Sequence, residues 1–541
     1  MIYVNDPEKI PVPEKEEYWD RSEKDYRKKI NLISGLTPHI TAGDENDAAA
    51  ANHNTPPSRG TLTDGNIPTS VSYDEKDWFK FARGQSREII FDITKISTVT
   101  GFRVVFMHQA EGRVFYPPEF KVALSVNGTD WETVFVKKQF YFKEPNEIFD
   151  FTKDFDEPMK ARFVRFSFEV DIWVFIGQLE VYGTKAIQRA ARDLAPTRPR
   201  RKKERNIGHY LMPEEFFGIR DLLLAYNCHP GRDDKGRWSV EWFKPFVGYY
   251  DREGNLKDYF FDAFLFLPFA AFPMRDPNCN ADTWRMYVDN TFAEGYNTDA
   301  LDYAYGETKR LLGDDSDRRA KVFLSILYPF KTQKNFGDLY GNGEKLDMSR
   351  LEDRKKAIKW LIDTQLELFK SRNYQNSELC GFYWYEEDML ISDAHDKPMI
   401  TWTTEYVHSL GYPVIWIPYF RASGYNKWWN YGIDYACMQP NYTFRDVDDG
   451  IVYTTADITK KYGMCVEMEI GGVSETYIDK YNRYMDVGAE KGYMDAVHMY
   501  YQGGCPGEFW KSFNSDDKKL NDVYHDTYLF ARQKYTPKTR S

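Results

Sequence analysis

The sequence lacks the motifs and the long apolar runs that define several large classes of protein. No apolar run approaches the roughly 18–20 residues that cross a bilayer, so we expect no membrane span. The chain contains no His-Glu-x-x-His helix, no phosphate-binding loop ending in Gly-Lys-Ser/Thr, no Gly-x-Ser-x-Gly elbow and no glycine fingerprint for a dinucleotide. These absences argue against a zinc protease, an ATPase, a serine hydrolase and a dehydrogenase.

Closely spaced cysteines and an excess of basic charge are also missing. The six cysteines all lie from Cys228 onward without a pairing pattern, which favours buried thiols over a disulfide framework. The net charge is -11 and the one dense basic stretch is Arg198–Arg205, so we expect no nucleic-acid partner. The residues after Met1 soon turn polar, so we expect no signal peptide among them.

Length and aromatic content are the first positive signals. A chain of 541 residues is too long for one hydrophobic core, because single cores stop growing at roughly 250–300 residues, so we expect at least two domains. Aromatic residues make up 17% of the chain. Such rings fill cores, and they also offer flat apolar faces that suit stacking on sugar rings.

Short alternating strands fill residues 58–184 and predict an antiparallel β-sandwich, preceded by a polar lead-in over residues 1–57. Aromatic and basic side chains near the expected loops are candidates for ligand contact: Trp78, Arg113, Tyr116 and Trp173. The expected strands are Arg87–Ile93, Val99–Met107, Glu119–Val126, Thr133–Lys137, Ala161–Val170 and Ile176–Val181.

These residues resemble the discoidin, or coagulation factor type C, module. The marks are Leu62-Thr63-Asp64-Gly65, Ser125-Val126-Asn127-Gly128-Thr129-Asp130-Trp131, Ala161-Arg162-Phe163-Val164-Arg165 and Gln178-Leu179-Glu180-Val181-Tyr182-Gly183. The resemblance implies a galactose-binding-like jelly roll that binds carbohydrate outside the cytoplasm. It also implies a structural calcium near the joined ends of the module, at Asp64 and Glu180, since calcium needs six to eight oxygen ligands.

Residues 185–206 are rich in Arg, Lys, Pro and Ala and predict a solvated linker.

Residues 207–541 then alternate strands with helical patterns, which predicts a (β/α)₈ barrel. Residues 229–259 show no clear helix. We interpret their aromatic side chains as the wall of a substrate groove: Trp238, Trp242, Phe243, Phe246, Tyr249 and Tyr250. The expected strands are Asp221–Cys228, Phe260–Leu267, Lys321–Tyr328, Leu379–Glu387, Pro413–Tyr419, Tyr435–Asn441, Met464–Glu469 and Asp495–Tyr501.

Carboxylates gather at the ends of the fourth and seventh expected strands, where barrel enzymes carry catalytic groups. Glu386 and Glu387 end the fourth strand, and Glu467 and Glu469 lie two apart on the seventh, so they share a face. Hydrolysis of a glycosidic bond needs two such carboxyl groups. The alternative is that these acids start helices or lie on the surface.

The fourth strand resembles that of the large superfamily of retaining barrel glycosidases, which carry Asn-Glu there. The resemblance implies Glu387 as acid/base and Glu469 as nucleophile, with Glu386 at the place of Asn. The roles of Glu467 and Glu469 can also be exchanged. Three stretches carry a likeness to an uncharacterised bacterial family: Asp221–Tyr226, Gly381–Glu387 and Val466–Glu469. In that family a discoidin-like module precedes a barrel of unknown function, and the resemblance covers most of the chain.

Other positions at the expected strand ends are candidates for sugar subsites: Asn227, Trp416, Tyr419, Gln439, Asn441, His498 and Tyr500. The leading hypothesis is a glycoside hydrolase that cleaves a polysaccharide or complex glycan by a retaining mechanism without a catalytic cofactor. A glycan-binding adhesion protein on a degenerate barrel and a polysaccharide lyase are the alternatives.

Overall fold

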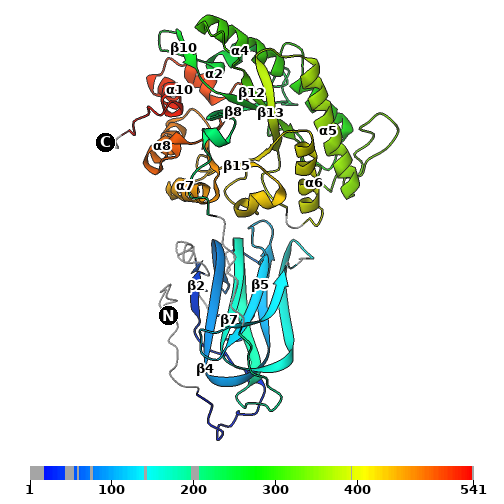
Figure 1. Cartoon of the computed structure of the whole chain (residues 1–541), viewed down its shortest axis with the longest axis vertical. Coiled ribbons are helices and arrows are strands. Elements are labelled where there is room, and N and C mark those ends of the chain that lie inside the picture. Colours follow the sequence, from blue (N-terminus) through cyan, green and yellow to red (C-terminus); the bar gives the residue numbers. More distant parts are fainter. Residues whose placement is uncertain are drawn as a thin grey trace. The chain divides into compact units, whose positions relative to one another are not determined.

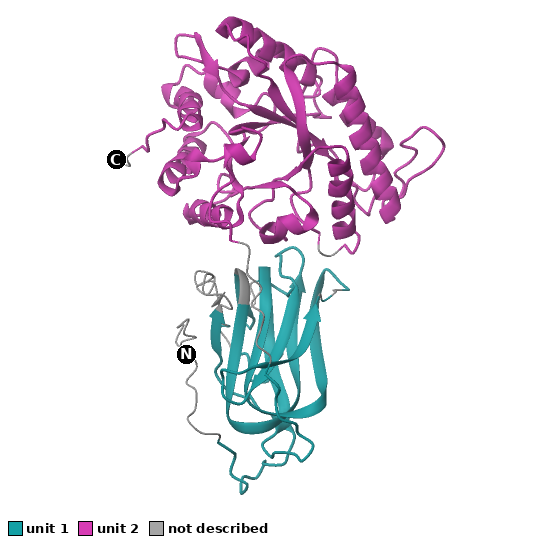
Figure 2. Ribbon diagram, in the orientation of Figure 1, with its two compact units in different colours: residues 1–203 teal, residues 204–541 magenta. Residues whose placement is uncertain are grey.

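The protein consists of two compact units, residues 1–203 and residues 204–541 (Figure 2). The computed structural model describes residues 17–42, 54–55, 57, 60–73, 77–138, 140, 143–196, 206–390 and 393–538. The division between the units falls inside the predicted linker, residues 185–206. None of the helices in the described part of the chain is long and apolar enough to cross a membrane.

The first unit is an antiparallel β-sandwich, as the sequence predicted (Figure 1). Its hydrogen-bonded order is β2-β4-β7-β5-β6, with β1 added to β7 and β3 added to β4. The strands are β1 (Ile30–Asn31), β2 (His39–Ala42), β3 (Asn54–Thr55), β4 (Phe79–Gln109), β5 (Glu119–Ser125), β6 (Glu132–Lys138) and β7 (Asn146–Thr184).

Strands β4 and β7 are longer than expected. Each merges two predicted strands. Where the sequence pattern suggested turns, the chain stays in the strand and only the register of its pairing shifts. Over Thr98–Met107, β4 pairs with both halves of β7 at once. Phe and Val side chains alternate inward along both strands and form the core between the sheets.

The lead-in and the linker belong in part to this unit. β1 and β2 lie within residues 1–57 and pair with the sandwich, so part of the predicted lead-in is structural. On the linker side, the Ala186 amide donates to the Tyr26 carbonyl, Arg192 pairs with Glu132 at 2.6 Å, and Leu194 packs on the core. The basic run, Arg198–Arg205, lies outside the described residues.

Two of the four ligand candidates in the sandwich are core residues, which corrects the prediction. Trp78 is fully buried, and its Nε1 donates to the Ser70 carbonyl at 2.9 Å. Tyr116 is 5% exposed and donates to Glu147. Neither ring offers a free face to a sugar. Trp173 and Arg113 are half-buried, so their sugar contacts stay predictions.

The predicted calcium ligands already have partners. Asp64 accepts the backbone amides of Thr61 and Asn66 at 2.8 and 2.9 Å, which closes its own loop. Glu180 faces the Arg103 guanidinium at 3.6 Å and accepts the Tyr182 hydroxyl. A carboxylate beside a guanidinium does not fit a calcium ligand, because the two cations repel. Across the described residues, no group of three or more metal-ligating acid, His or Cys side chains gathers.

A calcium ion held by Asp64 and neighbouring carbonyls stays a prediction. A ligand that binds only the native state stabilises it, so excess chelator is expected to lower the melting temperature of the full chain's first unit. An unchanged melting temperature would remove calcium from the account.

The second unit is a closed eight-stranded parallel barrel surrounded by helices, which confirms the predicted barrel (Figure 1). All eight expected strands are present. All six cysteines are free and five are buried. The strands are β8 (Asp221–Asn227), β11 (Ala263–Pro268), β12 (Ala320–Ile326), β13 (Ser377–Trp384), β14 (Val414–Trp416), β15 (Tyr435–Met438), β16 (Cys465–Glu469) and β17 (His498–Tyr501).

The connections supply the outer layer. The helices are α2 (Val240–Val247), α3 (Ala281–Thr291), α4 (Thr298–Leu312), α5 (Leu351–Ser371), α6 (Asp396–Ser409), α7 (Gly450–Tyr462), α8 (Glu475–Lys491), α9 (Glu508–Phe513) and α10 (Lys518–Ala531). Three 3₁₀ turns, η2 (Pro213–Glu215), η3 (Tyr425–Tyr431) and η4 (Tyr493–Asp495), and a hairpin of β9 (Gly248–Tyr250) and β10 (Leu256–Tyr259) complete the unit.

Residues 229–259 do contain a helix, so that prediction was wrong. The Ser239 hydroxyl accepts the Trp242 amide and starts α2. Trp238, Phe243 and Phe246 are fully buried: Trp238 stacks on Phe243 and meets Phe246 edge to face, and none of the three lines a groove. Their density reflects a helix that packs on the barrel core.

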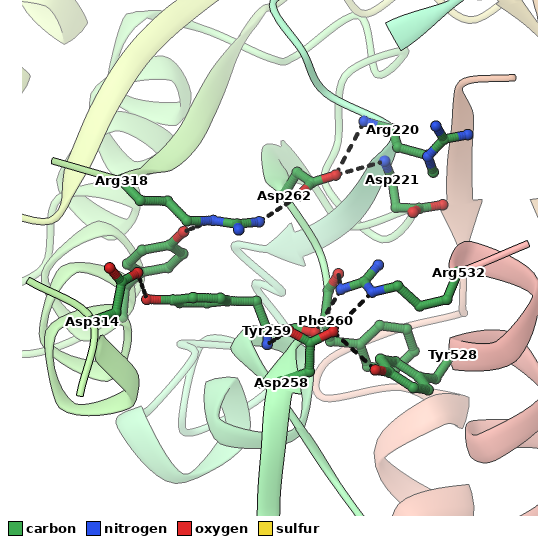
Figure 3. Close-up of polar contacts among 11 residues, drawn as sticks. Arg220, Asp221, Asp258, Tyr259, Phe260, Asp262, Asp314, Arg318, Tyr528 and Arg532 are labelled. Atoms are coloured by element: carbon green, nitrogen blue, oxygen red, sulfur yellow. Dashed lines mark hydrogen bonds and ion pairs between the residues drawn. The ribbon is translucent and has the colours of Figure 1, made fainter. Parts of the chain in front are cut away.

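A polar network closes the amino-terminal end of the barrel (Figure 3). Asp262 accepts the backbone amides of Arg220 and Asp221 and pairs with Arg318 at 3.0 Å. Arg532, which follows α10, pairs with Asp258 at 3.0 Å, and so ties the last helix to β10. Catalytic groups of barrel enzymes lie at the other end of the strands, so we interpret this network as structural.

Candidate active site

A cavity of about 240 Å³ lies at the carboxyl ends of the barrel strands. Acidic and aromatic side chains dominate its lining. The lining residues are Tyr226, Phe269, Ala270, Tyr385, Glu387, Gln439, Phe444, Glu467, Glu469, Tyr501 and Gly503. Three carboxyl groups therefore share one small cavity.

Strand β16 brings two of these groups inward. Cys465 lies in the barrel core, and the two-residue repeat places Glu467 and Glu469 on the same face. Glu469 ends the strand and lies nearer the rim, while Glu467 lies one layer deeper. Both are almost completely shielded from bulk solvent, at 0% and 1% exposed.

Glu469 has hydrogen-bond donors that favour its ionised form. Tyr484 on α8 donates its hydroxyl to Glu469 Oε2. Burial raises the pKa of Glu469 to about 8, with a contribution from Glu387, while the Tyr484 hydroxyl and the Asn441 amide oppose that rise. Of the two acids on β16, Glu469 is the better supplied with donors.

Glu467 lies in an environment that keeps it protonated. Its Oε1 has no hydrogen-bond partner in the described part of the chain. Burial first, and then the nearby Glu469 and Glu387 carboxyls, raise the pKa of Glu467 well above its ordinary value. Ionisation of one acid in the cavity disfavours ionisation of the others, because like charges repel. The three acids therefore titrate as a linked set.

Glu387 enters the same cavity from β13, on the face of Tyr385. It is half-buried, and so more open than the two acids of β16. Burial raises the pKa of Glu387, and the Gln439 amide lowers it. A raised pKa is the direction that a general acid needs.

Replacement of Glu467 by Gln should change how stability depends on pH. The raised pKa means that Glu467 favours folding below about pH 4.5 and loses that contribution as pH rises through the folded pKa. Gln cannot ionise. We expect equal melting temperatures near pH 4 and a higher one for the variant at pH 8, by about 2–4 °C for each kcal/mol relieved. The matched control is Glu214→Gln, at an exposed position. If the difference in melting temperature between Glu467→Gln and the wild type were the same at pH 4 and pH 8, the raised pKa of Glu467 would be contradicted.

Glu386, predicted among the catalytic group, lies outside the cavity lining. It is 2% exposed, and both carboxylate oxygens accept Arg275 Nη2, at 2.8 and 3.0 Å. Burial raises the pKa of Glu386 to about 7, although Arg275 lowers it. The alternation of the chain after β13 turns Glu386 away when Glu387 points in.

Four predicted subsite residues point away from the barrel interior, which corrects those predictions. Asn227 donates to Thr291 on α3, and Trp416 donates to the Glu386 carbonyl. His498 and Tyr500 both contact Asp221 Oδ1, at 3.1 and 2.8 Å. All four are fully buried. The residues next to these four in the chain point inward instead. The strands were therefore predicted correctly, but the wrong face of each was taken to point into the barrel.

Three other predicted residues do lie at the carboxyl-terminal end. Gln439 lines the cavity and donates to the Ile417 carbonyl at 3.0 Å. Tyr419 pairs with Gln439 in an isolated bridge. Asn441 has a left-handed backbone, with φ of 59°, and its amide approaches Glu469. Their contact with a sugar stays a prediction.

Aromatic side chains that the sequence analysis missed form much of the cavity wall. Tyr226 and Tyr501 lie edge to face at 5.6 Å between ring centroids, and Phe444 meets Tyr501 at 5.3 Å. Phe444 is 49% exposed, so it offers an apolar face at the cavity mouth. Residues two apart on a strand share a face. Taking Asn227 as an inward residue of β8 therefore excludes Tyr226, whereas taking the core residue Leu224 as inward includes it.

The fold and the cavity define a class of protein: an antiparallel sandwich followed by a barrel with acidic groups at its carboxyl-terminal end. The chain belongs to the family described as Domain of unknown function (DUF4855), whose model matches residues 221–529. An F5/8 type C domain matches residues 40–173. Both findings confirm the resemblance to a discoidin-like module followed by a barrel of unknown function.

Solved structures resemble the chain over the length of one module. CpGH89CBM32-6 of Clostridium perfringens is 19% identical and covers 28% of this chain and 99% of its own, with a TM-score of 0.20. The family 32 module of C. perfringens NanJ, solved with galactose, is 19% identical over 27% and 92%, with a TM-score of 0.18. The family 32 module of Streptococcus pneumoniae EndoD is 18% identical over 29% and 100%, with a TM-score of 0.18. No curated protein matches the chain.

Proposed function

We propose that the protein is a retaining glycoside hydrolase that cleaves a polysaccharide or complex glycan, with Glu469 as nucleophile and Glu387 as acid/base. One observation carries the proposal. Carboxyl groups from β13 and β16, two strands separated by β14 and β15, line one cavity between aromatic rings. Retaining cleavage needs two carboxyl groups, one to attack the anomeric carbon and one to protonate the leaving oxygen.

The surroundings of each acid support its role. The Tyr484 hydroxyl and the Asn441 amide lower the pKa of Glu469 against the rise that burial causes, which is the direction that a nucleophile needs. Glu387 is the most open of the three acids, where it can meet a leaving oxygen. Glu467 below them stays protonated and can donate a hydrogen bond toward Glu469. Tyr385, Phe444 and Tyr501 supply apolar faces for the sugar ring.

The sandwich serves as a glycan-binding module in this proposal. A second binding site on the same chain raises the local concentration of substrate at the barrel without any new contact there. Such a role places the protein outside the cytoplasm, where extended glycans are found.

A panel of polysaccharides and glycans tests the proposal with the full chain. New reducing ends without unsaturated products are expected for at least one member. Unsaturated products would instead indicate a lyase, and binding without any product would indicate an adhesion protein; either outcome overturns the proposal.

A further inference from the structure

Two arginines lie on the loops that follow β14 and β15, close in the chain to residues of the cavity wall, and the proposed function leaves them unused. Arg421 lies in the turn after β14 that is closed by the Ala422 amide and the Tyr419 carbonyl at 2.8 Å. Tyr419 in turn bridges to Gln439 in the cavity wall. Arg445 follows β15 and comes directly after Phe444, which lines the cavity. We call these two residues the rim arginine pair.

The backbone of the second loop is held in place from α8. Lys480 donates its ammonium to the carbonyls of Tyr442 and Arg445. The Arg445 amide returns to the Tyr442 carbonyl at 3.3 Å. The loop is therefore fixed by its main chain, and the Arg445 guanidinium takes no part in holding it.

The rim arginine pair carries charge that the described residues do not neutralise. Neither guanidinium forms an ion pair or a hydrogen bond within the described ranges, and both side chains are half-buried. Burial lowers the pKa of Arg445, and the nearby Arg421 lowers it further, while Tyr419 and Glu469 act in the opposite sense. Two like charges that are partly removed from water repel each other, and an anion between them would relieve that cost.

The cavity itself excludes an anionic group. Glu387, Glu467 and Glu469 line it, and a further negative charge there would be repelled by whichever of them is ionised. An acidic substituent must therefore lie outside the three carboxyl groups. Phe444 and Tyr419 connect the rim arginine pair to the cavity wall. Among the described residues, Arg275 is a further cation near that wall, but it already pairs with Glu386.

We propose that Arg421 and Arg445 bind an anionic group of the glycan, a uronate carboxylate or a sulfate ester, next to the sugar that enters the cavity. The inference deepens the proposed function by naming its substrate class as an acidic glycan, and it rests on that function for the position of the cleaved bond. Arginine suits the task because its planar fork binds such oxyanions with two parallel hydrogen bonds.

Binding measurements on the full chain carrying Glu469→Gln test the inference without turnover. The probes are matched pairs: uronic-acid oligosaccharides with their carboxyl-reduced forms, and sulfated oligosaccharides with their desulfated forms. In one series, the acidic member is expected to bind at least about 10-fold more tightly than its neutral partner. The series that shows this difference identifies carboxylate or sulfate as the group bound.

Variants then connect that difference to the rim arginine pair. Arg421→Gln and Arg445→Gln should each weaken binding of the acidic member by about 10-fold and leave binding of its neutral partner unchanged. The salt dependence of binding should also fall. Arg310→Gln, an exposed arginine on α4, is the matched control and should change nothing.

The two proposals fail in different ways. Equal binding of acidic and neutral members, or unchanged acidic binding in both arginine variants with normal melting temperatures, would overturn the inference. Discrimination by the arginine pair in a chain that hydrolyses no member of the panel would overturn the proposed function and leave the inference standing.

Discussion

A chain carrying Glu469→Gln is expected to lose at least about 10⁴-fold of the wild-type turnover, on the scale of losing a covalent nucleophile in other hydrolases. An amide of the same shape fills the place of Glu469 and can accept the Tyr484 hydroxyl, but it cannot attack an anomeric carbon. Affinity for the glycan should therefore stay within a few-fold of the wild type. Initial rates and calorimetric binding on the same oligosaccharide measure both quantities.

Glu467→Gln is the matched comparison for that variant, because it removes a carboxylate from the same strand and the same face. We expect a smaller loss of turnover, since a protonated Glu467 and a Gln present similar hydrogen bonds to Glu469. Normal turnover in Glu469→Gln together with loss of turnover in Glu467→Gln would contradict the assignment and exchange the two roles.

Glu387→Gln should show a loss that depends on the leaving group. A general acid contributes about 10²–10⁴-fold where the departing oxygen needs a proton, and little where it leaves readily. Natural glycans should therefore suffer the full loss, while activated aryl glycosides keep a near-normal first step. Kinetics with a series of leaving groups of different acidity measure this slope.

The neighbouring Glu386→Gln provides the control for the acid/base. Glu386 pairs with Arg275 and lies outside the cavity lining, so its loss should affect all leaving groups alike. An equal loss for good and poor leaving groups in Glu387→Gln, with a leaving-group dependence in Glu386→Gln, would contradict the choice of acid.

The positions of the barrel strands and of the acids were predictable because apolar runs mark buried strands and because a repeat of two fixes which residues share a face. The inward face of other strands was not. On β17, the polar His498 and Tyr500 suggested subsites, yet both point outward to Asp221 on β8. A partner more than 270 residues away satisfies them, and no local pattern reveals such a partner.

The aromatic stretch after β8 misled for a related reason. Pro245 and a run of large rings obscured the pattern of α2, whose apolar face covers the barrel. Conversely, the wall residues Tyr226 and Tyr501 read as core positions, because in a barrel the same inward face forms the core below and the cavity above.

The anomeric configuration of the first product tests the central claim most directly, that Glu469 attacks the anomeric carbon and Glu387 protonates the leaving oxygen. Proton NMR during the first turnovers of the wild-type chain on its preferred glycan records it before the anomers equilibrate. The account predicts the configuration of the substrate, as two successive displacements require. A product of inverted configuration, or an unsaturated one, would contradict it.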